Sequence, residues 1–415
     1  MVEVGGGIEA RSMTTPFADK RIVFGVTGGI AAYKAADWVR SLRKAGAEVT
    51  VVMTKAATQF VTPLTFAALS GRPVECEIFD SKRPEAIPHI SLAQECDLLL
   101  IAPATANTTA RLAHGMADTL LTNIALATQA KVMIFPAMNS TMYLHAATQG
   151  NLERLRQLNY TVVPPAYGLM ACGDEGPGRL PDWPTAETAI AAALSPQDLS
   201  NQHFLITAGP TQEPLDPVRF LSNRSTGKMG YALARAARQR GAVVTLVTGP
   251  TAIPPPSGIK IVQVRTALEM QQAVFENYAS ATVIIKSAAV SDFRPSTTAP
   301  RKIKKGQAAA TSLDLSANPD ILLELGKKKG QATGPLLIGF AAESDHLLQE
   351  GHRKLVDKNL DLMVVNDIMN TDTGFAADTN QITILDKDGA QTSLPLLSKD
   401  ETAHRLLDRI THLLQ

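Results

Sequence analysis

Short apolar runs alternate with helical patterns along most of the chain. In the first half we expect buried strands at 22–26, 49–53, 98–104, 132–138 and 161–165, and helices at 62–70, 89–96, 105–129 and 140–158. A further helix, with apolar residues at helical spacing, links the first two strands and ends at Gly46. Strands that alternate with helices in this way predict a doubly wound parallel sheet.

The alternation stops at residue 173 and restarts near residue 203. Residues 173–201 are rich in Gly, Pro, Asp, Ser and Ala, which predicts loop and linker with one short helix near 185–194. Beyond this segment we expect a helix at 226–240 and strands at 203–211, 242–249, 259–264, 281–290, 335–343 and 360–367. Asp388-Gly389 predicts a hairpin turn, and an apolar stripe predicts a final amphipathic helix.

These patterns predict two α/β domains, each with a mostly parallel Rossmann-like sheet flanked by helices. The expected bounds are 1–19 for a disordered tail, 20–190 for the first domain, 191–200 for a linker and 201–415 for the second domain. A chain of 415 residues fits this division because it exceeds what a single hydrophobic core usually spans.

Charge and cysteine usage narrow the function classes. The formal net charge is +1, so bulk charge favours neither nucleic acid nor an anionic membrane as a partner. No apolar run reaches the ~18 residues of a membrane span. The cysteines Cys76, Cys96 and Cys172 are odd in number and lack CxxC spacing, which argues against disulfides and structural zinc and favours the cytoplasm.

A glycine turn follows the first strand of the first domain, where ligands bind in open α/β sheets. The turn is Thr27-Gly28-Gly29, and the dinucleotide pattern GxGxxG is absent. NAD is therefore disfavoured, whereas a mononucleotide phosphate such as that of FMN stays compatible with the turn. A plain strand–helix turn explains the two glycines equally well.

The second domain has a related segment, SNRSTGKMG at 222–230, which resembles a P-loop but departs from it. Ser222 stands in place of the first glycine, and Met229 follows the lysine in place of Ser or Thr. An anion site is favoured over a capped helix with a solvated basic turn, because four residues gather here ahead of a helix: Arg219, Asn223, Arg224 and Lys228.

Polar residues follow two strands of the first domain. Thr105, Asn107 and Thr108 come after one strand and either cap a helix or contact a flavin or a phosphate. Asn139 comes after the next and is either a turn residue or a ligand for a substrate carboxylate. His89 stands at an expected helix start, where a neutral imidazole is favoured, and a surface histidine is the simpler interpretation.

The segment ACGDEGPGR at 171–179 sets Cys172 among three glycines and a proline. Neither a helix nor core packing is expected for such a composition, which predicts a flexible loop. An exposed thiol is open to oxidation, which makes a functional use of Cys172 the better explanation.

Taken together, these motifs resemble two enzyme families in tandem. PATANT (103–108), PAMNSTMY (136–143), the His89 segment and ACGDEGPGR resemble the flavin-dependent cysteine decarboxylases. In the second half, ITAGPT, DPVRFLSNRSTGKMG, SAAVSDFRP, KIKK, NPDIL, GFAAE and KNLDLMVVND are similar to phosphopantothenoylcysteine synthetase. In this order they resemble the bifunctional ligase/decarboxylase family of coenzyme A biosynthesis over nearly the whole chain after residue 20.

The resemblance implies a flavodoxin-like first domain with decarboxylase activity. Asn139 would hold the substrate carboxylate, and His89 would support oxidative decarboxylation by flavin. The glycines of 171–179 would form a mobile flap, on which Cys172 would donate the proton that completes the product. Tyr143 stands where related decarboxylases often have Trp, which leaves the packing of the substrate wall open. The residues implied to bind FMN are Gly28, Gly29, Thr54, Thr105, Asn107 and Thr108.

For the second domain the resemblance implies ligation of cysteine to 4′-phosphopantothenate through an acyl-cytidylate made from CTP. Mg²⁺ and lysines are expected because several negative oxygens meet there. Asn223 and Arg219 would handle the acyl-cytidylate and the substrate phosphate. The implied CTP site comprises Ala288, Asp292, Lys302, Asn318, Pro319, Asp320, Ile321, Phe340, Lys354 and Lys358.

The family further implies a homo-oligomer built from decarboxylase trimers and ligase dimers. Two other interpretations of the first domain stay open, namely a peptidyl-cysteine decarboxylase and a non-enzymatic regulator of the same fold. Neither explains the second domain, and the regulators lack the flap cysteine or carry acidic tails.

Overall fold

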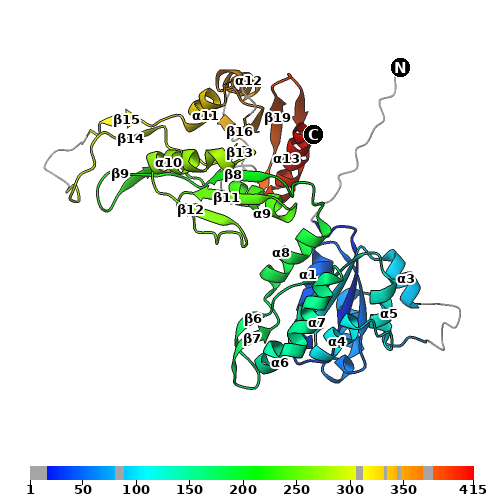
Figure 1. Ribbon diagram of the computed structural model, residues 1–415. Coiled ribbons are helices and arrows are strands. Elements are labelled where there is room, and N and C mark those ends of the chain that lie inside the picture. The colour runs from blue at the N-terminus through cyan, green and yellow to red at the C-terminus, as the bar shows by residue number, and fades with distance from the viewer. Residues whose placement is uncertain (1–15, 80–87, 305–311, 331–333, 344–346, 368–376) are drawn as a thin grey trace, which may run out of the picture. The chain divides into compact units, whose positions relative to one another are not determined.

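The computed structural model describes residues 16–79, 88–304, 312–330, 334–343, 347–367 and 377–415. The chain divides into two compact units, Met1–Ser195 and Pro196–Gln415 (Figure 1). The division falls inside the segment 191–200, but the first part of that segment is helical because α8 (Trp183–Leu194) continues through it. No helix of the described residues is long and apolar enough to cross a membrane.

The first unit is built on a five-stranded parallel sheet of order β2-β1-β3-β4-β5. Its strands are β1 (Arg21–Val26), β2 (Glu48–Met53), β3 (Leu98–Ala104), β4 (Lys131–Pro136) and β5 (Thr161–Val162), and a separate hairpin pairs β6 (Ala166–Leu169) with β7 (Glu175–Arg179). The helices are α1 (Ala32–Lys44), α2 (Pro63–Ser70), α3 (Pro88–Glu95), α4 (Ala106–Ala113), α5 (Leu120–Ala127), α6 (Ser140–Leu144), α7 (Ala146–Gln157) and α8. This strand order is that of the flavodoxin-like doubly wound folds.

Two hydrophobic cores sandwich this sheet. Helices α1, α2 and α8 pack on one face, where Trp38 meets the ring of Phe135 edge-on with centroids 5.0 Å apart. Helices α3, α4, α5 and α7 pack on the other face. The apolar runs of the sequence are therefore strands buried on both faces, as predicted.

The second unit has an eight-stranded sheet of order β12-β11-β8-β13-β16-β17-β19-β20. Its central strands are β8 (His203–Ala208), β11 (Val243–Thr248), β12 (Lys260–Gln263), β13 (Val283–Lys286), β16 (Leu336–Glu343) and β17 (Leu362–Asp367), all parallel. The hairpin strands β19 (Ile382–Asp386) and β20 (Gln391–Ser393) extend the sheet antiparallel around Gly389, which has a positive φ of 86°. The chain leaves β8 toward β11 and later returns to β13 on its other side, so the topological switch point lies between β8 and β13.

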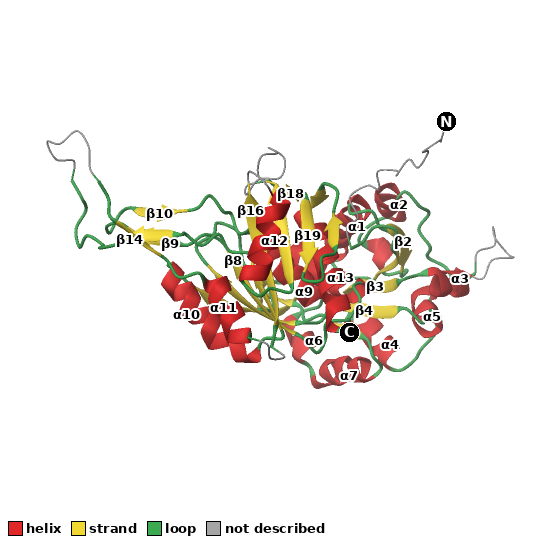
Figure 2. Ribbon diagram, turned by 90° about the horizontal axis from the view of Figure 1, so that it is seen from above, coloured by secondary structure: helices red, strands yellow, loops and turns green. Residues whose placement is uncertain are grey.

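Helices cover both faces of the second sheet (Figure 2). On one face pack α9 (Lys228–Gln239) and the predicted C-terminal helix α13 (Lys399–Leu414), and on the other α10 (Ala267–Asn277), α11 (Ile321–Lys329) and α12 (Leu347–Asp357). Two short antiparallel pairs, β9 (Gln212–Pro214) with β10 (Phe220–Ser222) and β14 (Phe293–Pro295) with β15 (Leu315–Ala317), lie away from the sheet of this unit in both views. A last pair joins β18 (Thr379–Asn380) to β21 (Leu397–Ser398).

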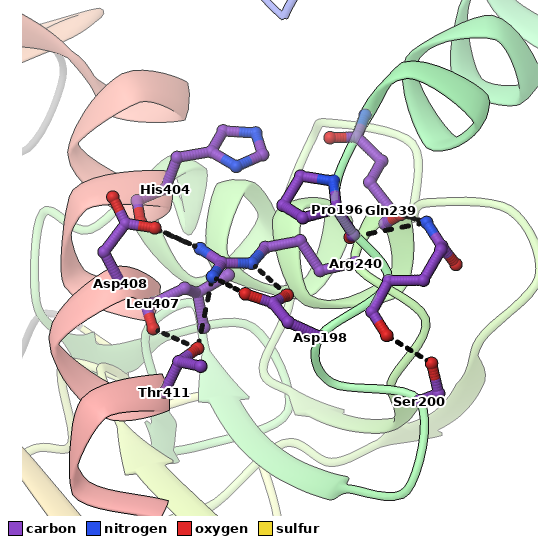
Figure 3. Close-up of polar contacts among 10 residues, drawn as sticks. Pro196, Asp198, Ser200, Gln239, Arg240, His404, Leu407, Asp408 and Thr411 are labelled. Atoms are coloured by element: carbon purple, nitrogen blue, oxygen red, sulfur yellow. Dashed lines mark hydrogen bonds and ion pairs between the residues drawn. The ribbon is translucent and has the colours of Figure 1, made fainter. Parts of the chain in front are cut away.

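A buried ion-pair cluster ties the first residues of the second unit to its last helix (Figure 3). The guanidinium of Arg240, only 3% exposed, donates to both carboxylate oxygens of Asp198 at 2.9 and 2.5 Å and to Asp408 of α13 at 2.6 Å. The same group reaches Thr411 Oγ1 at 3.1 Å and the carbonyl of His404 at 3.3 Å. The Arg240 hydrogen bond holds the pKa of Asp198 below its ordinary value.

Several sequence predictions of local structure were wrong at the level of single elements. The helix expected over 105–129 is two helices, because the chain turns at Gly115 with a φ of 66°. The helix expected over 140–158 divides at His145, which adopts an extended conformation and caps α7. The segment 173–201 was expected to be mainly loop but contains strand β7.

Candidate functional site

A cavity of about 870 Å³ opens at the carboxyl ends of β1, β3 and β4 in the first unit. Loops after these strands and the β6–β7 hairpin form its wall. The predicted residues that line it are Gly28, Gly29, Thr54, Thr105, Asn107, Thr108, Asn139 and Cys172. The structure therefore brings together eight of the nine residues predicted for this unit.

Hydrogen bonds between strand ends fix the floor of this cavity. The Thr27 hydroxyl donates to the Pro103 carbonyl at 2.6 Å and accepts from the Thr105 backbone N–H at 3.0 Å. The Thr105 hydroxyl caps α4 by accepting from the backbone N–H of Thr108. Thr105 is thus a helix cap and a cavity residue at once, so the two interpretations offered by the sequence do not exclude each other.

The glycine turn after β1 leaves no room for a side chain. A Cβ atom on Gly28 would lie 2.3 Å from the Cβ of Ala56, well inside contact distance. The turn therefore faces the cavity with backbone and small atoms, which is what a phosphate needs for close approach.

Asn139, Cys172 and Asp174 form a triangle of polar contacts in this cavity region. The Asn139 amide donates to the Cys172 sulfur at 3.3 Å and to Asp174 Oδ2 at 3.1 Å, and the Cys172 thiol donates to the same Asp174 oxygen at 3.4 Å. The Asn139 Oδ1 accepts from the Thr141 backbone N–H at 2.9 Å, which fixes the direction of the amide donors. Asp174 was missed by sequence reasoning, although it stands two residues after Cys172 in the same motif.

The β6–β7 hairpin carries the thiol into this triangle. Cys172 lies in the hairpin turn, where Gly173 adopts a positive φ of 89°. Gly178 in β7 accepts from the backbone N–H of Met138 at 3.0 Å, and a Cβ on Gly178 would lie 2.2 Å from the Met138 carbonyl oxygen. The glycines predicted to form a flap therefore permit a strand to press against the loop that holds Asn139.

His89 is the predicted residue that does not line the cavity. It stands on α3, and its Nδ1 atom is buried with no hydrogen-bond partner among the described residues. Tyr143, the departure from related decarboxylases, is also absent from the lining and packs partly against the core around α4 and α5. Its identity therefore bears on that core rather than on the cavity wall.

Four cations of the cavity lining were not selected from the sequence, namely Lys34, Lys55, Arg111 and Arg179. Lys34 of α1 and Arg179 of β7 both line the cavity. Burial lowers the pKa of Lys34, and the nearby charge of Arg179 lowers it further. Two positive charges close enough to repel each other favour an anion between them.

In the second unit the candidate residues lie at the carboxyl ends of β8 and β13, beside the switch point. Asn223 donates from its amide to the carbonyls of Ala289 and Val290 at 3.2 and 3.1 Å. These bonds join the SNRSTGKMG segment to the loop that begins with Ala288, which is 7% exposed.

The loop before α11 contacts the same loop after β13. The Asn318 amide donates to the Ser291 carbonyl at 2.8 Å, and its backbone N–H donates to the Asp292 carbonyl at 2.8 Å. Asp320 caps α11 by accepting from the Leu323 N–H at 3.0 Å and pairs with Lys358 at 2.7 Å. The structure therefore brings Asn223, Asp292, Asn318 and Asp320 into one region, and Lys358 joins it from the end of α12.

Other predicted members of the nucleotide site have different surroundings. Ile321 is 2% exposed and packs in the core between α11 and the sheet, which it shares with Ala288. Phe340 packs partly against the core on the opposite face of the sheet, with α9 and α13. Pro319 is half-buried beside the Asp320 cap.

Arg219 is occupied by contacts within its own unit. Its guanidinium donates to Asp216 at 3.0 and 2.5 Å and to the Ile303 carbonyl at 2.9 Å, and the Ile303 N–H donates to Asp216 at 3.1 Å. The Arg219 hydrogen bond holds the pKa of Asp216 well below its usual range. This arrangement anchors the loop that carries the exposed Lys302, whereas the last lysine of KIKK lies outside the described residues.

Lys228 does not stand free at the start of α9. Its ammonium pairs with Asp378 at 2.6 Å, and Gly227 precedes it in a left-handed conformation with a φ of 79°. Across the described ranges there is no group of three or more His, Cys, Asp or Glu side chains that could hold a metal ion.

Comparison with known proteins covers both units. Residues 11–195 match the family model described as Flavoprotein, and residues 199–414 match the model described as DNA/pantothenate metabolism flavoprotein C-terminal domain. The coenzyme A biosynthesis bifunctional protein CoaBC of Escherichia coli strain K12 is 46% identical over 396 residues, which cover 95% of this chain and 97% of that protein. The protein of the same description from Bacillus subtilis strain 168 is 44% identical over 400 residues, with 95% and 97% covered.

Among solved structures, a crystal structure described as the C-terminal domain of the coenzyme A biosynthesis bifunctional protein CoaBC is similar to this chain. It is 41% identical, with a TM-score of 0.45, and the match covers 52% of this chain and 98% of that one. The relatives of nearly equal length establish the relationship over both units. The chain therefore belongs to the family of bifunctional coenzyme A biosynthesis proteins.

Proposed function

We propose that the second unit ligates cysteine to 4′-phosphopantothenate with CTP, and that the first unit decarboxylates the product to 4′-phosphopantetheine with FMN. The observation that carries this proposal is the contact of Asn139, Cys172 and Asp174 in a cavity that begins at a glycine turn. There an amide suited to bind a carboxylate lies beside a thiol suited to donate a proton.

The cavity lining fits flavin mononucleotide. Its volume of about 870 Å³ is in the range of small-molecule sites, and the close approach of Gly28 to Ala56 keeps the phosphate turn free of side chains. The hydroxyls of Thr54 and Thr108 and the amide of Asn107 supply donors for the rest of the cofactor. When bound, the flavin would take up two electrons from the substrate thiol before carbon dioxide leaves and would return them to the decarboxylated product, which is again a thiol.

Asn139 binds the carboxylate that is lost as carbon dioxide. In the structure its amide donates to Asp174 Oδ2 at 3.1 Å, so a carboxylate oxygen already occupies the acceptor position. The substrate carboxylate takes this position in the complex, and Asp174 moves away with the hairpin turn because two carboxylates repel each other. Cys172 shares this turn and donates its proton to the enethiolate carbon after carbon dioxide has left.

Two of the cations that line the cavity serve the phosphate of the substrate. Lys34 and Arg179 repel each other, and this cost is offset when a phosphate lies between them. The pantothenoyl arm then spans the cavity from these cations to Asn139.

His89 does not line the cavity of its own chain, so a role in decarboxylation requires a second copy that brings α3 to this cavity. The trimer implied by the family resemblance is consistent with that requirement.

In the second unit, the carboxylate of 4′-phosphopantothenate attacks the α-phosphorus of CTP and pyrophosphate leaves. The amine of cysteine then attacks the acyl-cytidylate and displaces CMP. Lys302, Lys354 and Lys358 supply positive charge for these steps, and Mg²⁺ accompanies the nucleotide phosphates, which are its usual ligands. The side-chain NH₂ group of Asn223 donates to two backbone carbonyls. Its Oδ1 atom can therefore accept a hydrogen bond from the cysteine amine and orient it.

The test is incubation of the full chain with 4′-phosphopantothenate, cysteine, CTP and Mg²⁺, followed by mass analysis of the products. We expect 4′-phosphopantetheine, CMP and pyrophosphate, and no product when CTP is omitted. Supplying phosphopantothenoylcysteine without CTP should restore 4′-phosphopantetheine. A colourless protein whose denatured extract holds no flavin would contradict the proposal for the first unit.

A further inference from the structure

One lysine at the switch point of the second unit belongs to none of the motifs. Lys286 is the last residue of β13, and its Cα pairs with Thr207 of β8 on one side and Gly339 of β16 on the other. It thus stands at the carboxyl end of a central strand, beside the crevice where doubly wound sheets bind ligands.

The side of the sheet that Lys286 faces follows from the alternation of the strand. Ile284, two residues earlier, packs with Ile321 of α11 and Leu355 of α12. Side chains two apart share a face, so Lys286 points toward the start of α11 and the end of α12. The candidate residues Asp320 and Lys358 lie at that same place.

Charged groups surround Lys286 without pairing with it. Its pKa is lowered to about 8, chiefly by burial and also by the charges of Lys358 and Lys354, while Asp320 and Asp292 act in the opposite direction. Asp320 is already engaged by Lys358 and by the Leu323 N–H. Lys286 itself has no hydrogen bond or ion pair with any residue that the structure describes.

A desolvated ammonium without a partner is costly, and two neighbouring lysines, Lys354 and Lys358, add repulsion to that cost. The two nearby carboxylates do not remove it, because one of them is shared with Lys358 and neither lies within ion-pair distance of Lys286. An anion with several oxygens would pair with Lys286 and offset its repulsion from the two neighbouring lysines. A triphosphate is the anion that the proposed reaction brings to this edge of the sheet.

We propose that Lys286 is a nucleotide-binding residue of the ligase site, and that its ammonium pairs with a phosphoryl oxygen of CTP. This inference rests on the proposed function and adds to it a residue that the family motifs do not include.

The experiment compares full-length wild type with Lys286→Met, which keeps an unbranched side chain and removes the charge. Lys327→Met is the matched control, because Lys327 is exposed on the far end of α11 and the charge change is the same. Binding of CTP with Mg²⁺ and of cytidine, which lacks phosphates, is measured by calorimetry at pH 7.5. We expect Lys286→Met to weaken CTP binding roughly 10- to 100-fold, with cytidine binding and the control unchanged.

The pH dependence provides a second test with Lys286→Arg. The charge of Lys286 is lost as pH rises through its pKa of about 8, so wild-type CTP affinity should fall by up to roughly 20-fold between pH 7.5 and 9.5. Arginine stays charged throughout this range, so Lys286→Arg should retain its CTP affinity at pH 9.5.

Equal loss of CTP and cytidine binding in Lys286→Met would overturn the inference, because it indicates a structural role. Unchanged CTP binding in Lys286→Met would overturn the inference as well. In that case, CTP-dependent ligation by the wild type would still support the proposed function. Wild type that neither binds CTP nor forms phosphopantothenoylcysteine would overturn both. Decarboxylation of supplied phosphopantothenoylcysteine verifies in each variant that the chain is folded.

Discussion

Replacing Arg240 by Met should destabilise the second unit while leaving the first unit unchanged. The substitution removes a guanidinium that is 3% exposed and contacts Asp198, Asp408, Thr411 and the His404 carbonyl. Methionine fills part of the same volume, so lost packing is a minor contribution. The main cost is the loss of the charged hydrogen bonds.

The magnitude depends on how well the abandoned carboxylates can be hydrated. Breaking a buried ion pair by removing one partner costs roughly 3–5 kcal/mol. Asp198 and Asp408 are 32% and 59% exposed, so water replaces part of what Arg240 provides. We therefore expect a loss of about 2–4 kcal/mol, which corresponds to a melting temperature lower by on the order of 5–15 °C for a unit of this size.

The distribution of tryptophans allows the unfolding of the two units to be measured separately. Trp38 and Trp183 are the only tryptophans of the sequence, and both belong to the first unit. Denaturant unfolding followed by tryptophan fluorescence should therefore give the wild-type midpoint, whereas the far-ultraviolet circular dichroism should show an earlier transition for the second unit. Arg238→Met is the matched control, because Arg238 lies two residues earlier in the chain and is exposed.

The effect of Arg240→Met should also depend on pH. The folded-state pKa of Asp198 is lowered by the Arg240 hydrogen bond, so this pair stabilises the fold fully above the ordinary value of 3.8 and is lost as pH falls below it. The pKa of His404 is lowered by burial and also by the Arg240 charge, so this histidine takes up a proton more easily in the variant. The difference between wild type and variant should therefore be constant from pH 7 to 8 and shrink in acid. A tryptophan transition that moves with the circular dichroism, or a loss below about 1 kcal/mol at pH 7, would refute this account of the cluster.

Three further predictions concern the two proposed sites. Cys172→Ser should still release carbon dioxide but fail to form 4′-phosphopantetheine, because a hydroxyl is a far weaker acid than a thiol; normal product measured by mass spectrometry would contradict this role. Asn223→Asp should abolish ligation and spare decarboxylation, because a carboxylate cannot donate to the carbonyls of Ala289 and Val290 and is repelled by both; phosphopantothenoylcysteine detected by mass spectrometry after incubation of the variant with CTP and cysteine would refute it. Asp174→Ala should lower KM for phosphopantothenoylcysteine roughly tenfold, because it removes an acceptor that competes for the Asn139 amide, and an unchanged or higher KM would show that no such competition exists.

The residues that the sequence predicted for the first site share a simple property. Gly28, Thr54, Thr105 and Asn139 follow directly after apolar runs, and parallel strands present their carboxyl ends at one edge. The apolar pattern was therefore sufficient to bring them together. Asp174 has no such signal, because its contact with Asn139 is made only when the hairpin folds back across the loop after β4.

The hairpin itself was not predicted because its composition contradicts its structure. Residues 175–179 contain two glycines and a proline, which are depleted in strands. They form β7 because Gly178 has to fit against the Met138 carbonyl and Gly176 against Ser140, where a Cβ would lie 2.2 and 2.8 Å away. The close approach to another backbone, which only tertiary structure reveals, overrides the local preference.

In the second unit, the sequence pattern predicts a strand but not the surroundings of its last side chain. A lysine that ends an apolar run, such as Lys286 in VIIK, is easily taken for the polar end of a strand. Which face it occupies follows from the alternation with Ile284, but which charges it meets there depends on α11 and α12. Gly326 of α11 packs so closely on the Lys358 carbonyl that a Cβ would lie 1.9 Å from it, and Asn359, with a φ of 51°, donates to the Gly326 and Gly330 carbonyls. The join between these two helices sets the position of Lys358, and therefore the repulsion that makes Lys286 dependent on an anion.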